Sequence, residues 1–150
     1  MKNYTTSSSE ETKKLAAKFA QKVVKLRPRP HAVVIGFVGD LGAGKTTFVQ
    51  GFLKALGARS KVTSPTFVLI KRHPVGHKGL KYAYHIDSYR LKHHRDLEIF
   101  DFKKTVSDPR NIILIEWAEK VKKLLPKDTI WVKFSHGKKE NERKIKCRLA

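Results

Sequence analysis

The chain has 150 residues, 40% of them hydrophobic, which fits a single domain over 1–150 that buries roughly 70% of its unfolded surface. One cysteine, Cys147, excludes an internal disulfide framework and a multi-cysteine zinc site, and no apolar run approaches the ~20 residues of a membrane span. The N-terminus also lacks the apolar core of a secretory signal, so we expect a soluble, cytoplasmic protein with no membrane attachment. The formal net charge is +20, a field that attracts polyanions without deciding the fold.

The first predicted element is a helix over residues 9–26. Its apolar residues recur at helical spacing, with lysines on the opposite face, and two prolines follow its end. A serine with a glutamate three residues later resembles a capping box at its start. The candidate pairs combine Ser7 or Ser8 with Glu10 or Glu11. Residues 1–8 are polar, and we expect them to form a flexible tail.

A strand, a glycine-rich turn and a second helix are predicted next. Residues 32–38 form a continuous apolar run, the pattern of a strand buried on both faces. The glycine-rich turn follows at once. Apolar residues at helical spacing over 48–56 then indicate an amphipathic helix that ends at Gly57.

The second half of the chain is predicted to be rich in strands. Residues 111–117 contain another buried-type run. Two antiparallel hairpins flank it, and residues 92–107 form a short helix or loop. The hairpins pair Thr66–Lys71 with Lys81–Ile86 around a loop at 73–79, and Thr129–Phe134 with Arg143–Leu149 around Gly137. This mixture of elements indicates an α/β fold with parallel and antiparallel strands. Together with the glycine-rich motif described next, it predicts a three-layer sandwich of the P-loop NTPase type with a mixed sheet.

The most specific motif is Gly39-Asp-Leu-Gly-Ala-Gly-Lys-Thr46, which matches G-x-x-x-x-G-K-[ST] between the predicted strand and helix. Its glycines let the backbone wrap around an anion, and the helix beginning near the last glycine adds its positive end. Lys45 reaches the β- and γ-phosphates, the Thr46 hydroxyl binds Mg²⁺, and Thr47 lies on the α-phosphate side. The predicted nucleotide-binding residues are Gly39, Asp40, Leu41, Gly42, Ala43, Gly44, Lys45, Thr46, Thr47 and, further on, Trp117.

Two acidic residues follow apolar runs, where the carboxyl ends of strands bind ligands in α/β proteins. We expect Glu116 to serve Mg²⁺, with a solvated strand end as the alternative. We expect Asp87 to be catalytic or to orient water, with a helix cap or turn as the alternative. Trp117 stacks on a nucleobase or is a buried core residue. The hydroxyl-rich turn Thr63–Phe67 reaches the γ-phosphate as a switch or is an ordinary turn.

Taken in order, these motifs resemble the TsaE (YjeE) family of bacterial P-loop ATPases. The resemblance covers nearly the whole chain, from the Ser/Glu-rich first helix onward. The matching segments are Gly39–Thr47, Gly51–Gly57, Val62–Phe67, His85–Leu91 and Ile115–Trp117.

The resemblance implies an ATP-binding and ATP-hydrolysing accessory protein. Such an accessory protein supports turnover of the TsaD–TsaB complex, which transfers threonylcarbamoyl to an adenosine of tRNA. ATP and Mg²⁺ are the implied cofactors, with Thr46 and Glu116 managing the metal and Lys45 acting at the phosphates. The resemblance further implies that Asp87 is the catalytic acidic residue, Thr66 the switch contact and Trp117 the base-side aromatic. Hydrolysis is expected to be slow without the partners, because the site is completed at an interface.

The charge departs from what this family pattern leads one to expect. Basic clusters near the C-terminus either contact tRNA held by the complex or reflect an unusual host. His73 and His77 lie across a proline and a glycine, so a metal site there is disfavoured. The main alternative function is a P-loop small-molecule or nucleoside kinase, for which the chain offers only a vague basic segment. An RNA-binding module without catalysis would leave the P-loop unexplained.

Overall fold

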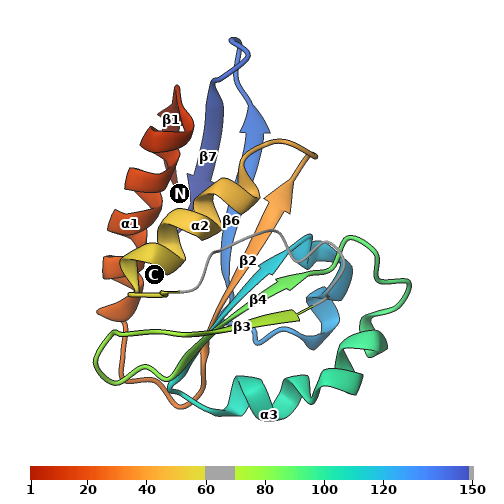
Figure 1. The fold of residues 1–150 in the computed structure, drawn as a ribbon. Helices are drawn as coiled ribbons and strands as arrows, with labels where there is room; N and C mark the ends of the chain where they lie inside the picture. Colours follow the sequence, from red (N-terminus) through yellow and green to blue (C-terminus); the bar gives the residue numbers. More distant parts are fainter. Residues whose placement is uncertain (60–69, 149–150) are drawn as a thin grey trace.

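A seven-stranded mixed β-sheet organises residues 1–59 and 70–148, the part of the chain that this computed structural model describes (Figure 1). In chain order, its strands are β1 (Lys2–Thr6), β2 (Val33–Gly39), β3 (Ile70–Pro74), β4 (Tyr82–Asp87), β5 (Asn111–Glu116), β6 (Ile130–His136) and β7 (Arg143–Cys147). The order across the sheet is β1-β7-β6-β2-β5-β4-β3. The neighbours β6, β2, β5 and β4 are parallel, whereas β3, β7 and β1 pair antiparallel at the two sides.

Helices cover both faces of the sheet. They are α1 (Ser9–Val24), α2 (Lys45–Ala55), α3 (Phe102–Ser107) and two 3₁₀ segments, η1 (His94–Phe100) and η2 (Ala118–Leu124). One apolar cluster joins α1 and α2 to the sheet, and a second joins η1, α3 and η2 to the opposite face. In Figure 1, α1 and α2 lie in front of the strands. The predicted three-layer α/β sandwich with a mixed sheet is confirmed.

The two central strands are almost entirely buried because both of their faces are covered. The β2 sequence VVIGFVG and the β5 sequence NIILIE carry the apolar runs recognised in the sequence. Successive side chains, such as Ile112 and Ile113, belong to opposite clusters. Parallel strands covered on both sides must be apolar on both sides, so these runs mark the middle of the sheet.

The start of α1 follows its capping signal. Ser8 is the cap, and its Oγ accepts a hydrogen bond from the Glu11 backbone N–H at 3.1 Å. The Glu11 Oε2 accepts in return from the backbone N–H of Ser7 at 2.7 Å. Of the candidate pairs, Ser8 with Glu11 is thus the one that acts, and the helix ends at Val24, two residues before the predicted end.

The expectation of a flexible tail over residues 1–8 is wrong, because β1 pairs along its length with β7. The Tyr4 ring packs against the core on the α1 side of the sheet. The Oγ1 atoms of Thr6 and Thr12 share a buried hydrogen bond of 2.7 Å. A five-residue polar edge strand has little hydrophobic periodicity, and its order comes from pairing with a strand far away in the sequence.

The predicted β3–β4 and β6–β7 hairpins are present, although positions 66–69 of the first lie outside the described residues. His73 and Pro74, predicted as part of its loop, instead pair in β3. Residues 92–107, predicted as a short helix or loop, contain η1 and α3. The segment η2, after β5, was not predicted. Among the described residues, no helix combines the length and apolar character needed to cross a membrane.

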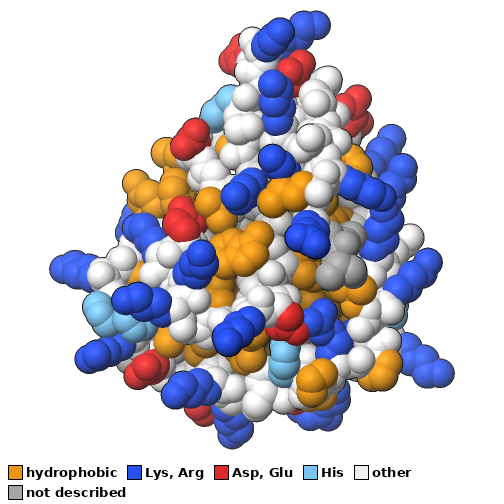
Figure 2. All heavy atoms as spheres, turned by 180° about the vertical axis from the view of Figure 1, so that it is seen from behind, with side chains coloured by type: hydrophobic (Ala, Val, Ile, Leu, Met, Phe, Trp, Pro, Cys, Tyr) orange, Lys and Arg blue, Asp and Glu red, His pale blue; other side chains and the backbone are white. Residues whose placement is uncertain are grey.

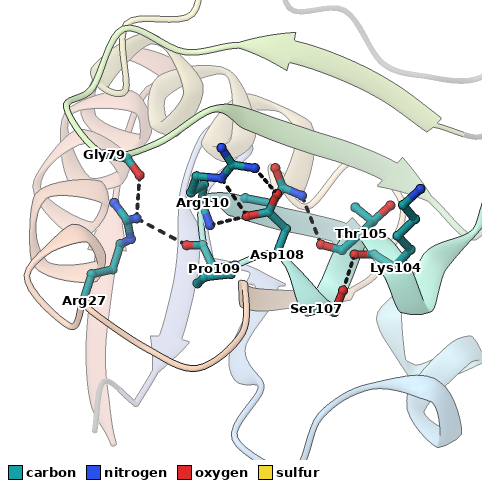
Figure 3. A network of polar contacts seen from close by, with 9 residues as sticks. Arg27, Gly79, Lys104, Thr105, Ser107, Asp108, Pro109 and Arg110 are labelled. Atoms are coloured by element: carbon teal, nitrogen blue, oxygen red, sulfur yellow. Dashed lines mark hydrogen bonds and ion pairs between the residues drawn. The ribbon is translucent and has the colours of Figure 1, made fainter.

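Polar contacts tie connections together at one end of the sheet (Figure 3). The Arg27 guanidinium, just after α1, donates to the carbonyl of Gly79 at 2.6 Å and to that of Pro109 at 3.3 Å. Arg110 donates to the Asp108 carboxylate, and this hydrogen bond holds the pKa of Asp108 below its ordinary value. These contacts fix the turn that leads into β5, the strand that ends at Glu116.

Candidate functional site

The glycine-rich loop lies between the end of β2 and the start of α2. Gly39, Gly42 and Gly44 have φ angles of 148°, 74° and 102°, in the region that favours glycine. At Gly39 a Cβ would lie 2.4 Å from the carbonyl oxygen of Phe134, so a side chain there collides with backbone. The helix cap, Gly44, offers no side-chain hydrogen bond, and the first turn of α2 has no acidic residue. The start of this helix therefore suits an external anion.

A cavity of about 850 Å³ opens over this loop. The sequence-predicted residues Lys45, Thr46, Asp87, Glu116 and Trp117 line it together, although they come from three separate regions of the chain. Residues that sequence reasoning did not assign to the site complete the lining. They include Ser8, the cap of α1, Ser9 and Thr12 within α1, Asn141 and Arg143 of the last hairpin, and Tyr89, Arg90 and Leu91 after β4.

Lys45 is held at the base of the loop. Its Nζ donates to the carbonyl oxygens of Gly39 at 2.5 Å and Asp40 at 2.8 Å. The same Nζ lies 4.2 Å from the centre of the Trp117 ring, in cation–π range. Burial lowers the pKa of Lys45, and the nearby Glu116 carboxylate acts in the opposite direction. The ammonium is thus partly desolvated and bound by carbonyls that an anionic ligand would replace.

Glu116 links the loop helix to the sheet. It is buried at the end of β5, with 3% of its surface exposed. Its Oε1 accepts a hydrogen bond from the Thr46 Oγ1 at 2.8 Å. Its Oε2 lies 2.5 Å from Nε2 of His85, whose side chain is fully buried in β4. Both carboxylate oxygens are therefore engaged, and the one at Thr46 faces the loop.

His85 contacts the predicted site residue Glu116, and sequence reasoning did not single it out. Side chains two apart in a strand share a face, so His85 lies on the same face as Asp87. The adjacent parallel strand β5 places Glu116 in register with Asp87. The signal was available in the His-x-Asp spacing at the end of a predicted strand, because a histidine there is within reach of the next strand's carboxylate.

Asp87 reaches the cavity from the tip of β4. Its Oδ1 accepts a hydrogen bond from the backbone N–H of Tyr89 at 2.9 Å. Burial raises the pKa of Asp87, and the neighbouring Glu116 carboxylate raises it further. The expected convergence of Asp87 and Glu116 at one edge of the sheet is what the structure shows, since both line the same cavity.

Trp117 leaves β5 with a left-handed backbone, at a φ of 58°. Its ring centre lies 4.9 Å from that of Tyr89, and its other neighbour is the Lys45 ammonium. The aromatic therefore lies at the lysine end of the cavity, and stacking on a nucleobase stays a prediction. Thr66 and the switch segment 63–67 lie outside the described residues.

The residues present fit a magnesium-bound nucleoside triphosphate. Thr46, Glu116 and Asp87 offer hard oxygen donors beside an anion-binding loop, the set that Mg²⁺ uses together with phosphate oxygens and water. Within residues 1–59 and 70–148, no group of three or more His, Cys, Asp or Glu side chains could hold a metal by itself. A site of this kind relies on the phosphates to complete the coordination.

Nearly the whole chain matches one protein family. A family model described as "Threonylcarbamoyl adenosine biosynthesis protein TsaE" matches residues 6–145. The chain belongs to the TsaE family. This confirms the resemblance seen in the sequence, and it is consistent with a nucleotide-binding site at the loop.

Individual relatives agree with this assignment. A tRNA threonylcarbamoyladenosine biosynthesis protein TsaE from Bacillus subtilis is 34% identical over 146 residues, which cover 95% of this chain and 82% of the relative. One from Haemophilus influenzae is 36% identical over 119 residues, 79% of this chain and 72% of the relative. The crystal structure of Bacillus subtilis YdiB superposes with a TM-score of 0.68 at 28% identity, covering 97% of this chain and 83% of that one.

Proposed function

We propose that this protein binds and hydrolyses ATP as an accessory factor that supports turnover of a TsaD–TsaB complex in the threonylcarbamoyladenosine modification of tRNA. The observation that carries the proposal is the meeting of the glycine-rich loop with two carboxylates in one cavity. Lys45 and Thr46 come from the loop helix, and Asp87 and Glu116 come from the tips of adjacent strands. Membership of the TsaE family supports the same role and a place in the cytoplasm.

In this proposal, the backbone N–H groups of residues 39–46 hold the phosphates. Lys45 exchanges its bonds to the Gly39 and Asp40 carbonyls for bonds to the β- and γ-phosphate oxygens. Thr46 and Glu116 would hold Mg²⁺, which when bound neutralises charge that develops on the phosphate oxygens. Since Thr46 and Glu116 are already hydrogen-bonded to each other, their oxygens are preorganised toward one point.

Asp87 is proposed to orient the attacking water and to take up its proton. Its hydrogen bond from the Tyr89 backbone leaves the second carboxylate oxygen available for water. A pKa raised by burial makes Asp87 a better proton acceptor than an exposed aspartate. Thr66 is proposed as the contact that senses the γ-phosphate, and Trp117 as the aromatic beside the bound nucleotide.

Partners are proposed to complete the site at its mouth. Leu41, within the loop itself, is 75% exposed, and Tyr89 at the cavity rim is 49% exposed. Apolar side chains around a functional cavity support contact with another protein. TsaD and TsaB are the proposed protein partners, and the strongly basic surface is proposed to contact tRNA.

The test is ATP hydrolysis by the purified protein, measured alone and with TsaD and TsaB from the same source. We expect slow release of ADP and phosphate from the protein alone and a marked increase with both partners. Asp87→Asn should bind ATP without supporting that increase. A separate reaction offers nucleosides and other small phosphate acceptors. Stoichiometric phosphorylation of an acceptor, with no response to the partners, would replace this proposal with a kinase.

A further inference from the structure

The sheet is covered unevenly, and this leaves one face of β1, β7 and β6 bare. On the α1 side of these strands, Phe134, Ile145 and Cys147 belong to the core, and Tyr4 packs against it. On the other side, the cluster formed with η1, α3 and η2 reaches β6 only at Trp131. Side chains that alternate with the core residues beyond that point are exposed.

This bare surface is lined by lysines and uncharged polar residues. We call it the basic sheet face, and it consists of Lys133, Lys144, Lys146, Asn3, Thr5 and Ser135. A shallow hollow of about 420 Å³ lies over it. Figure 2 looks at the molecule from behind Figure 1, and Lys and Arg side chains outnumber Asp and Glu there.

The pairing register brings like charges together on this face. Lys133 on β6 lies directly opposite Lys146 on β7, and Lys144 is two residues away on the same strand. The sequences of β1, β6 and β7 contain no Asp or Glu, and none of these three lysines forms an ion pair with another described residue. Like charges directly opposite each other in a sheet are destabilising, so a bound polyanion would relieve a repulsion present in the fold.

The chemistry of this face favours phosphates over a protein surface. Interface cores between proteins are depleted in lysine and enriched in aromatic side chains, which serve as anchors. The basic sheet face instead offers ammonium groups next to hydroxyl and amide donors, the groups that contact nucleic-acid backbones without reading sequence. Its rigid strands hold these donors in fixed rows.

We propose that the basic sheet face binds the phosphate backbone of tRNA. This deepens the tRNA contact put forward under the proposed function and rests on the role in tRNA modification. The contact is electrostatic, tolerant of sequence and steeply dependent on salt. It lies on the sheet face opposite to α1 and α2, so RNA binding and nucleotide binding can be measured separately.

The test compares two variants of equal net charge. The first changes Lys133, Lys144 and Lys146 to Gln, and the second changes Lys14, Lys18 and Lys22, which are exposed on α1, to Gln. Binding of an unmodified tRNA transcript is followed by fluorescence anisotropy over a range of salt concentrations. A third variant, with Arg at the three sheet positions, keeps the charge. A fluorescent ATP analogue reports on the nucleotide site in every variant.

We expect the sheet-face Gln variant to bind tRNA at least about 10-fold more weakly at low salt, with a salt slope lower by about two to three. The α1 variant and the Arg variant should stay within about two-fold of the unaltered protein. Equal losses in both Gln variants, no loss in either, or no tRNA binding by the unaltered protein would each overturn the proposal. So would a sheet-face variant that keeps tRNA binding but no longer associates with TsaD and TsaB. Failure of the ATP analogue to bind the unaltered protein would instead count against the proposed ATPase.

Discussion

Replacing His85 with Ala tests how Glu116 is held. The imidazole is fully buried, and its Nε2 lies 2.5 Å from Oε2 of Glu116. Removing it leaves a buried carboxylate oxygen without that partner. An unsatisfied buried polar group costs about 1–3 kcal/mol, and more when the group is a carboxylate, so we expect a loss of about 3 kcal/mol in the free energy of unfolding. For a chain of this length, that lowers Tm by about 6–12 °C.

The same change should weaken the metal site. Without His85, only Thr46 orients the Glu116 carboxylate. Loss of a group that orients a metal ligand typically reduces metal affinity by about 10–100-fold. We therefore expect the ATP affinity measured with Mg²⁺ to fall by about 10–100-fold. The ATP affinity measured without Mg²⁺ should change little. His85→Gln, which keeps an N–H donor, should recover part of both effects.

Urea unfolding and calorimetric titration of nucleotide, with and without Mg²⁺, measure the two effects separately. If His85→Ala unfolds at the same urea concentration as the unaltered protein and binds Mg²⁺-nucleotide equally well, then His85 does not position Glu116. A loss of stability with unchanged Mg²⁺ dependence would leave His85 as a core residue only.

Three further substitutions test the glycine-rich loop, the Asp87 carboxylate and the packing of α1 against α2. Lys45→Ala should keep the fold and lose ATP binding in calorimetry; unchanged affinity would reject the site. Asp87→Asn should raise Tm at neutral pH, because burial lifts the pKa of Asp87 in the folded state and ionisation therefore costs stability as pH rises. That gain should vanish below the unfolded pKa of about 3.9, and a Tm difference that persists in acid would contradict this cause. Gly51→Ala places a Cβ 2.6 Å from the Cα of Lys13, where α1 crosses α2, and should cost about 1–3 kcal/mol in urea unfolding. Lys54→Ala, exposed on the same helix, is its control and should change stability by less than about 0.5 kcal/mol.

The parts of the fold that follow from local pattern were predictable. The apolar runs of β2 and β5 require cover on both faces, and the glycines between β2 and α2 permit positive φ angles. Asp87 and Glu116 end the neighbouring strands β4 and β5, and parallel strands end at the same edge of the sheet. Their positions therefore followed from strand direction.

What the sequence did not yield depends on contacts between distant segments. β1 is ordered by pairing with β7, at the other end of the chain, and its polar residues carry no periodic signal. His85 acquires its role only through the register between β4 and β5. The position of Trp117 depends on its left-handed backbone, a conformation uncommon outside glycine and not expected from a tryptophan.

The most direct test of the ATP site is a crystal structure of the protein with a non-hydrolysable ATP analogue and Mg²⁺. We expect the phosphates to lie on the amides of the glycine-rich loop, with Lys45 Nζ moved from the Gly39 carbonyl to a phosphate oxygen. The metal should lie beside the Thr46 hydroxyl and the Glu116 carboxylate, with Asp87 facing the γ-phosphate. Nucleotide bound elsewhere, or a loop that stays closed on Lys45 at saturating analogue, would contradict the assignment of this cavity as the ATP site.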